Sequence, residues 1–238
     1  MIVGSVSKLY LETLFYIIGR LLMSRYLKFS VFLYSFCFFA VAVALPSVAN
    51  PIRPYRELRY EGVIGQTSYY TCGPAAVATL LSHYYGQPTA ESEILELSEK
   101  AMEGSGKSPE ERGVTALALR QALAAKGIQA RGMRLTLTSL ADYFRKGGLP
   151  VVLHLTKPQM HYVLAVGMVG DWVILADPSW GRRIQPLSAL VNEQGFSGVT
   201  LVPLPPENLI STAKEQQSET LRWAEFRLAR LNSLRRKL

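Results

Sequence analysis

The chain carries the stretch GQTSYYTCGP at residues 65–74, and we expect the fold to form around it. Cys72 is one of only two cysteines, and the Gly73–Pro74 pair after it is typical of a turn into a helix, because proline needs no backbone N–H in the first turn. A thiol at a helix N-terminus feels the positive end of the helix dipole, which favours the thiolate. The amide of Gln66 can donate a hydrogen bond to an oxyanion beside that sulfur. The stretch therefore predicts a nucleophile, Cys72, and an oxyanion donor, Gln66.

The composition fits one domain with tails. The chain has 238 residues, 49% of them apolar, and a formal net charge of +8, of which +3 lies in residues 1–49. Because the middle of the chain is near neutral, we expect no basic face for nucleic acid. The spacing of the cysteines and histidines matches no zinc site, and neither a phosphate loop nor a dinucleotide fingerprint is present. We therefore expect no metal and no cofactor.

Residues 23–49 have the pattern of a secretory signal. A short basic start precedes the uncharged apolar run 29–45, and small residues end at Ala49, after which we expect cleavage. The alternative is a retained anchor in the inner membrane, for which the run is at the lower limit of length. Because residues 1–22 would place the signal too far from the start of the chain, we expect Met23 to be the true start and the first 22 residues to be an extension. The folded part is expected in the periplasm, and because Cys37 lies in the signal, the mature chain keeps a single cysteine.

The hydrophobic pattern of the rest of the chain predicts an α+β domain over residues 50–206. We expect helices at 72–85, 90–102, 114–126 and 137–146, then strands at 150–155, 160–169, 172–176, 182–186 and 198–202, with one earlier strand at 128–133 and a short helix at 187–191. Residues 50–65 are expected to form an extended arm or short strand, and residues 104–113 a loop.

Three local features follow from the same pattern. Thr89 is the expected N-cap of the second helix, and Thr138 or Ser139 that of the fourth. Glu91, with the other glutamates of the second helix, is expected on a solvated face.

The tail 207–238 has a helical period and many arginines. Its apolar positions fall on one face and include Leu221, Ala224, Leu228 and Leu231. One interpretation is a basic amphipathic helix that binds an acidic membrane surface or a partner helix. The other is a solvated, frayed helix with no partner.

His161 is the expected general base among the three histidines. His83 would lie about 16 Å along the helix from Cys72, which is too far for contact. His154 sits in a continuous apolar run and is expected to be structural, whereas His161 is the polar first residue of an apolar strand. Asp177 ends the next strand, and a hairpin between the two strands would bring its carboxylate to the His161 ring, whose tautomer it could hold.

These features resemble the peptidase C39 family of cysteine peptidases over residues 60–202. The resemblance implies a papain-like fold with Cys72 as nucleophile, His161 as base, Asp177 as the orienting acid and Gln66 as oxyanion donor. Known members cut leader peptides after a Gly-Gly pair, often as the N-terminal domain of an ABC exporter. The matching segments are Gln66, 72–76, 84–86, 113–117, 149–153, 161–163 and 177–178.

Two departures from the exporter-linked pattern bear on the substrate. Thr71 stands where those members commonly carry Asp, and this sequence contains no Walker A motif. A free-standing, exported domain of this kind resembles the peptidase-like component of bacterial functional-amyloid secretion systems. The expected function is a cysteine endopeptidase that cuts an exported or amyloid-forming polypeptide, with amyloid subunits or other secretion components as partners.

Two alternatives stay open. One is a non-cleaving C39-like binding or chaperone module, although such modules often lose the cysteine that this chain keeps. The other is a different Cys-His-Asp acyl transferase, such as a transglutaminase-like or cell-wall amidase enzyme. The short gap from His161 to Asp177, with Gln66 just before the cysteine, fits the C39 pattern better.

Overall fold

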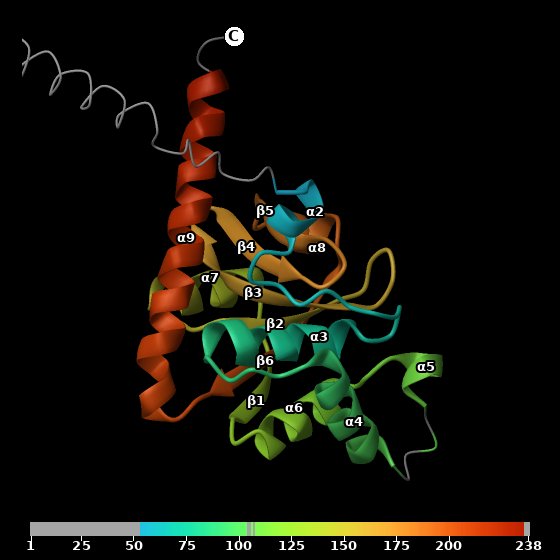
Figure 1. Cartoon of the computed structure of the whole chain (residues 1–238). Helices are drawn as coiled ribbons and strands as arrows, with labels where there is room; N and C mark the ends of the chain where they lie inside the picture. The colour runs from blue at the N-terminus through green and yellow to red at the C-terminus, as the bar shows by residue number, and fades with distance from the viewer. Residues whose placement is uncertain (1–52, 104–105, 107, 236–238) are drawn as a thin grey trace, which may run out of the picture. The chain divides into compact units, whose positions relative to one another are not determined.

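A computed structural model describes residues 53–103, 106 and 108–235 and confirms the predicted α+β class (Figure 1). The predicted signal at 23–49 lies outside the described residues. The helices are α2 (Tyr55–Arg59), α3 (Cys72–Thr79), a π-helical turn η1 (Leu80–Tyr84), α4 (Glu91–Met102), α5 (Pro109–Arg112), α6 (Ala116–Ala125), α7 (Leu137–Arg145), α8 (Ala189–Asn192) and α9 (Glu207–Arg235). In this described part of the chain, no helix has both the length and the apolar character needed to cross a membrane.

The strands form a single antiparallel sheet in the order β1-β6-β2-β3-β4-β5. They are β1 (Gln129–Arg134), β2 (Val151–Leu155), β3 (His161–Val169), β4 (Trp172–Asp177), β5 (Gly181–Pro186) and β6 (Phe196–Leu204). The predicted hairpin joins β3 to β4, with Val169 opposite Trp172. Its turn needs a left-handed residue, and Gly170 supplies it with φ of 57°.

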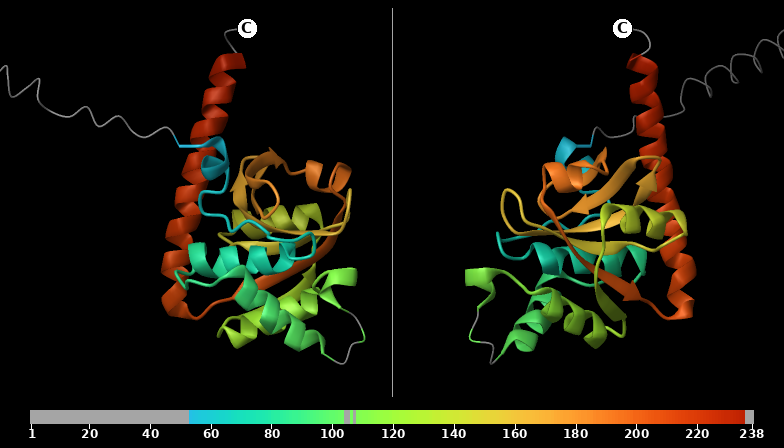
Figure 2. Two further views of the ribbon diagram at one scale, coloured as in Figure 1. Left: turned by 45° about the vertical axis from the view of Figure 1, so that its right-hand side comes forward. Right: turned by 180° about the vertical axis from the view of Figure 1, so that it is seen from behind.

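Both faces of the sheet are buried, which explains why its central strands are apolar without a strict alternation. Helices α3, α6 and α9 cover one face and α7 and α8 the other, as the two views of Figure 2 show. The first face presents Val152, Leu164, Val166, Ile174, Ala176 and Leu201. The second presents Val151, Leu153, Val163, Ala165, Val173 and Leu175. Helix α3 is buried along its whole length, so its N-terminus is held rigidly against the sheet.

The C-terminal helix α9 packs on the sheet over its first half, so it is not a frayed tail in solvent. Ala213 and Ala224 are fully buried in the core of the first face. The amide of Gln217 donates to the carbonyls of Gly148 at 2.9 Å and Val166 at 2.6 Å. The residues from 53 onward form one compact unit, which includes α9. The tail predicted from residue 207 thus packs with the domain predicted at 50–206 in the same compact unit.

The C-terminal end of α9 projects past the sheet (Figures 1 and 2). Phe226, Leu231 and Leu234 are exposed there. Leu231, which was expected on the apolar face, is thus outside the packed part, because the sheet ends before that helical turn.

Several local expectations are wrong. Residues 55–59 form α2 in place of an extended arm, and the expected loop 104–113 contains α5, which the Ser108 side chain caps. The N-cap position of α4 is Ala90, because the Thr89 hydroxyl donates to the carbonyl of Gln87.

Two further corrections concern the fourth predicted helix and Glu91. The N-cap of α7 is Thr136, whose side chain accepts the N–H of Ser139. Glu91 is buried, because its carboxylate accepts the backbone N–H of Thr67 at 3.0 Å instead of facing solvent.

We predict that α9 stabilises the domain through its buried face. Ala224→Asp places a carboxylate in the apolar core and should lower the free energy of unfolding by about 3 kcal/mol. Ala229→Asp makes the same change at an exposed position of the same helix and should cost no more than about 0.5 kcal/mol. Chemical denaturation of both variants checks this, and equal losses would contradict the packed arrangement.

Candidate active site

The N-terminus of α3 holds Cys72 at the floor of a cleft. Cys72 is the first residue of the helix and is only 6% exposed. A tight turn leads into it, since the Thr71 hydroxyl accepts the N–H of Ser68 at 3.1 Å and donates to the carbonyl of Ser68 at 3.0 Å. The backbone N–H of Tyr162 donates to Cys72 Sγ at 3.4 Å. The sulfur therefore lies beside two positive dipole ends, the N-terminus of helix α3 and the peptide N–H of Tyr162.

The first residue of β3 and the last residue of β4 meet beside this sulfur. Antiparallel pairing puts Leu164 opposite Ala176, so His161 and Asp177 lie at the same end of the sheet. The His161 Nε2–H donates to Asp177 Oδ1 at 2.9 Å. This bond leaves the other ring nitrogen, Nδ1, available to Cys72, whose proximity contributes to raising the pKa of the ring. The structure thus brings together the three side chains that the sequence singles out from distant segments.

The Asp177 carboxylate is buried and held from several sides. It is 1% exposed, and Oδ1 also accepts the N–H of Ser179 at 2.9 Å, while Arg183 donates to Oδ2 at 3.1 Å. Burial alone raises the pKa of Asp177, but the hydrogen bond and charge of His161, with Ser179 and Arg183, bring it below its ordinary value. Asp177 is therefore an anion fixed in place, which suits it to orient a histidine ring.

The His161 ring is held in its charged form. Burial lowers the pKa of His161, but the hydrogen bonds to Asp177 and Cys72 and the charges of both raise it to about 9. The imidazolium therefore persists through neutral pH and can give a proton to a leaving group.

Gln66 connects the segment before Cys72 to the turn after Asp177. Its amide oxygen accepts the Ser179 hydroxyl at 2.6 Å, and its backbone N–H donates to the carbonyl of Pro178 at 3.0 Å. One of its two amide N–H bonds goes to the carbonyl of Ser68 at 2.8 Å. Gln66 is thus anchored within the site, with one amide hydrogen committed to the loop that precedes α3.

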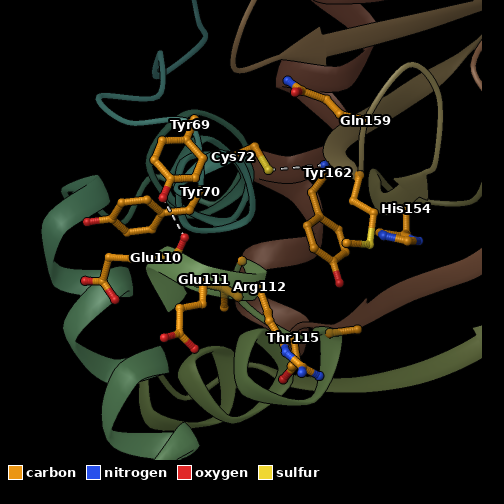
Figure 3. A pocket seen from close by; sticks show the side chains of 14 residues that line it. Tyr69, Tyr70, Cys72, Glu110, Glu111, Arg112, Thr115, His154, Gln159 and Tyr162 are labelled. Carbon is orange, nitrogen blue, oxygen red and sulfur yellow. Dashed lines mark hydrogen bonds between the residues drawn. The ribbon is translucent and has the colours of Figure 1, made fainter. Parts of the chain in front are cut away.

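A cavity opens on each side of the Cys72–His161 pair. The first, of about 380 Å³, is mostly apolar and lies over Cys72, with walls that include Tyr69, Tyr70, Met160 and Tyr162 (Figure 3). Figure 3 shows the sulfur pointing to the backbone nitrogen of Tyr162. The second, of about 490 Å³, is lined by His161 and Asp177 together with residues of the 155–159, 179–183 and 193–194 segments. An extended polypeptide that crosses the sulfur would pass from one cavity to the other.

The other two histidines, His154 and His83, have partners other than Asp177. His154 Nδ1 lies 3.0 Å from the Ser197 hydroxyl, and its ring stands 4.9 Å from that of Tyr162, at the margin of the first cavity. His83 lies in η1 with its ring edge-on to Tyr84. Among the described residues, no three His, Cys, Asp or Glu side chains are grouped to hold a metal ion.

Four groups that contribute to the site were not predicted from the sequence. They are the Tyr162 N–H, Ser179, Arg183 and the Glu91 carboxylate that holds the loop before Cys72. Ser179 follows an Asp-Pro pair, and a side chain–backbone turn is typical of such a sequence. Arg183 depends on the register of β4 with β5, which pairs it with Leu175 and which no local pattern fixes.

Comparison with known proteins finds similar proteins in Pseudomonas and Streptococcus. The chain is 25% identical over 199 residues to the probable functional amyloid protease FapD of Pseudomonas aeruginosa, covering 77% of this chain and 84% of that protein. It is 28% identical over 160 residues to the transport/processing ATP-binding protein ComA of Streptococcus pneumoniae, covering 66% of this chain and 20% of ComA.

A solved structure and a family model support the same relationship. The crystal structure of the peptidase domain of Streptococcus ComA matches with a TM-score of 0.51 at 23% identity, covering 60% of this chain and 98% of that domain, which supports the predicted papain-like fold. The model of the Peptidase C39 family matches residues 61–208, well over half of the chain. The chain therefore belongs to the Peptidase C39 family and is a peptidase.

Proposed function

We propose that Cys72 is the nucleophile of this peptidase, that His161 is its general base and acid, and that Asp177 is the positioning residue for the imidazole. The observation that carries the proposal is the hydrogen bond from the His161 ring to the buried Asp177 carboxylate, with Cys72 near enough to contribute to the raised pKa of that ring. In a thiol peptidase these three groups must meet in that order, because the base must reach the sulfur while a third group fixes its ring.

The reaction is an acyl transfer in two steps. In the resting pair His161 Nδ1 holds the proton of Cys72, so the thiolate sulfur attacks the scissile carbonyl carbon and the imidazolium protonates the amine as the C–N bond breaks. Water, deprotonated by the now neutral ring, then attacks the thioester, and the C–S bond breaks to release the acid product and restore the thiolate beside the imidazolium. His161 protonates the leaving amine, so the part of the substrate after the scissile bond lies on the His161 side of the cleft.

Two N–H groups support negative charge on the substrate oxygen. The first is the backbone N–H of Cys72, which has no intrahelical acceptor at the start of α3. The second is the amide hydrogen of Gln66 that is not given to Ser68. Each such donor is worth about 3 kcal/mol in the transition state.

The substrate is cut after a Gly-Gly pair. The carbonyl carbon must come within about 3.5 Å of the sulfur, yet Cys72 is only 6% exposed under an apolar wall of tyrosines. Glycine at the scissile bond brings no side chain into that space, so its approach is the least obstructed. The resemblance of the sequence to C39 peptidases supports the same choice.

The natural substrate is an exported polypeptide, such as a subunit of a functional amyloid, met in the periplasm. The relative named as a functional amyloid protease supports this class of substrate. The signal-like pattern of residues 23–49 supports the compartment, with the enzyme free or anchored to the inner membrane.

Cys72→Ala should abolish cleavage and leave the fold intact, because alanine fits the small buried position at the start of α3. Mass spectrometry of Gly-Gly peptides, and of secreted proteins from cells with each variant, should show cleavage reduced by at least about a thousandfold. The matched control Cys37→Ala should cut as fast as the parent chain.

A companion assay separates the peptidase from a non-cleaving binding module. Iodoacetamide at neutral pH should alkylate Cys72, and a bound Gly-Gly peptide should protect it. Continued cleavage by Cys72→Ala would contradict the assignment of the nucleophile, and a Cys72 thiol inert to iodoacetamide would favour the binding module.

Asp177→Asn should move the alkaline limit of activity downward. The pKa of His161 is raised to about 9, so the required imidazolium persists below that pH and is lost as the pH rises through it. Removal of the carboxylate should lower the pH at which kcat falls on the alkaline side by at least about one pH unit, toward the ordinary histidine pKa of about 6.5. Asp171→Asn, in the β3–β4 turn, is the matched control and should keep the parent profile; identical profiles for both variants would exclude the positioning role.

Gln66→Glu tests the oxyanion donor while it keeps the anchor to Ser179; it also removes the hydrogen bond to the Ser68 carbonyl. Glutamate keeps an oxygen for the Ser179 hydroxyl but has no amide hydrogen to donate. We expect kcat to fall about a hundredfold with little change in KM. An unchanged kcat would show that Gln66 serves only to hold the loop.

A further inference from the structure

A third cavity, of about 340 Å³, lies outside the catalytic site between α2, the start of β5 and α9. Its lining contains four arginines and no carboxylate. We name it the arginine pocket and define it by Arg59, Arg182, Arg183, Arg227, Trp180 and Trp223. Three of these residues, from α2 and α9, lie outside residues 61–208 that match the family model. The pocket is therefore a feature of this chain that C39 membership does not specify.

Aromatic rings and backbone carbonyls hold the guanidinium groups in place. Arg182 and Arg227 lie 4.2 Å and 4.9 Å from the centre of the Trp223 ring. Arg59 donates through Nε, at 2.9 Å, and through a terminal nitrogen to the carbonyl of Trp180, whose ring it also faces at 5.4 Å. Such stacking orients a guanidinium without neutralising it, so its free N–H groups can bind an anion in fixed geometry.

A close approach of α2 builds one wall. Gly181 has φ of 75°, and a Cβ there would collide with the carbonyl oxygen of Arg59. Only glycine lets the helix lie this near to the turn, so the position of Arg59 against Trp180 is fixed by the fold.

The charges of the pocket are only half balanced. Arg182 pairs with Glu61, and Arg183 with Asp177. Within the described part of the chain, neither Arg59 nor Arg227 has a carboxylate partner, and the buried Nε of Arg182 has no acceptor. The remaining positive charge and the planar donors fit a carboxylate, which an arginine can bind through two parallel hydrogen bonds.

The pocket adjoins the catalytic cleft on the side of the leaving group. Trp180 and Arg183 line both the arginine pocket and the cavity beside His161 and Asp177. In the proposed mechanism, the residues after the scissile bond occupy that cavity. A polypeptide that continues in the same direction reaches the arginine pocket next.

We propose that the arginine pocket binds an acidic side chain of the polypeptide substrate, in the segment that follows the scissile bond. This proposal rests on the proposed function for the direction of the substrate. It assigns the chain a preference for substrates that are acidic after the Gly-Gly pair, and it gives α2 and α9 a role in recognition.

The first test measures binding without cleavage. Full-length Cys72→Ala is titrated with hexaglutamate and hexaglutamine peptides while tryptophan fluorescence is followed, because Trp180 and Trp223 line the pocket. Hexaglutamate alone should bind, and Arg227→Glu in the same background should weaken it by at least about tenfold. Arg222→Glu is the matched control, since it makes the same charge change at an exposed position of α9 that does not line the pocket, and it should alter the affinity less than about twofold.

Two further ligands test the source of the anion. Inorganic phosphate and phosphatidylglycerol vesicles are titrated against the same variants. The assignment to an acidic peptide is overturned if Arg227→Glu weakens the binding of phosphate or of the vesicles as much as it weakens the binding of hexaglutamate. It is also overturned if Arg227→Glu leaves hexaglutamate binding unchanged.

The second test uses the active enzyme and separates this proposal from the catalytic one. Gly-Gly peptides with three glutamates or three glutamines after the scissile bond are compared. Arg227→Glu should raise KM for the acidic peptide about tenfold at constant kcat and leave the neutral peptide unchanged. Cleavage that is indifferent to Arg227 would overturn the pocket and leave the peptidase in place. If the parent chain bound hexaglutamate through Arg227 but cut no peptide, the arginine pocket would stand and the proposed catalytic function would be overturned.

Discussion

The site depends on the buried hydrogen bond from the His161 ring to Asp177. The carboxylate is taken out of water at the end of β4, and only the imidazolium, Arg183 and backbone N–H groups offset that loss of hydration. The same contact occupies one ring nitrogen and leaves the other available to Cys72, which contributes to the raised pKa of the ring. The hairpin at Gly170 and the burial of α3 serve this geometry, since they bring the two strand ends and the helix N-terminus together.

A second consequence is the division of the cleft. Because the cavity over Cys72 is mostly apolar and the cavity beside His161 and Asp177 has a more polar lining, the two halves of a bound polypeptide meet different surroundings. The tyrosine-walled side favours close contact with a small residue at the sulfur. The other side leads past Trp180 and Arg183 to the arginines of α2 and α9.

Much of the fold could be predicted from the sequence, because helix and strand periods are local. The positions of Cys72, His161 and Asp177 also followed from local signals, namely a helix start, a strand start and a strand end joined by a hairpin turn. The environment of Glu91 could not be foreseen, since its burial depends on a backbone N–H 24 residues away. The place of α9 on the sheet and the stacking of Arg182 on Trp223 depend likewise on long-range contacts that leave no periodic trace.

The most direct test of the central claim is an NMR titration of the His161 ring in the parent chain, in Cys72→Ala and in Asp177→Asn. The thiol and the carboxylate both raise the pKa of this ring, so the account predicts a value near 9 in the parent chain and a lower one in each variant. A ring that titrates near 6.5 in all three proteins would contradict the convergence of sulfur, imidazole and carboxylate.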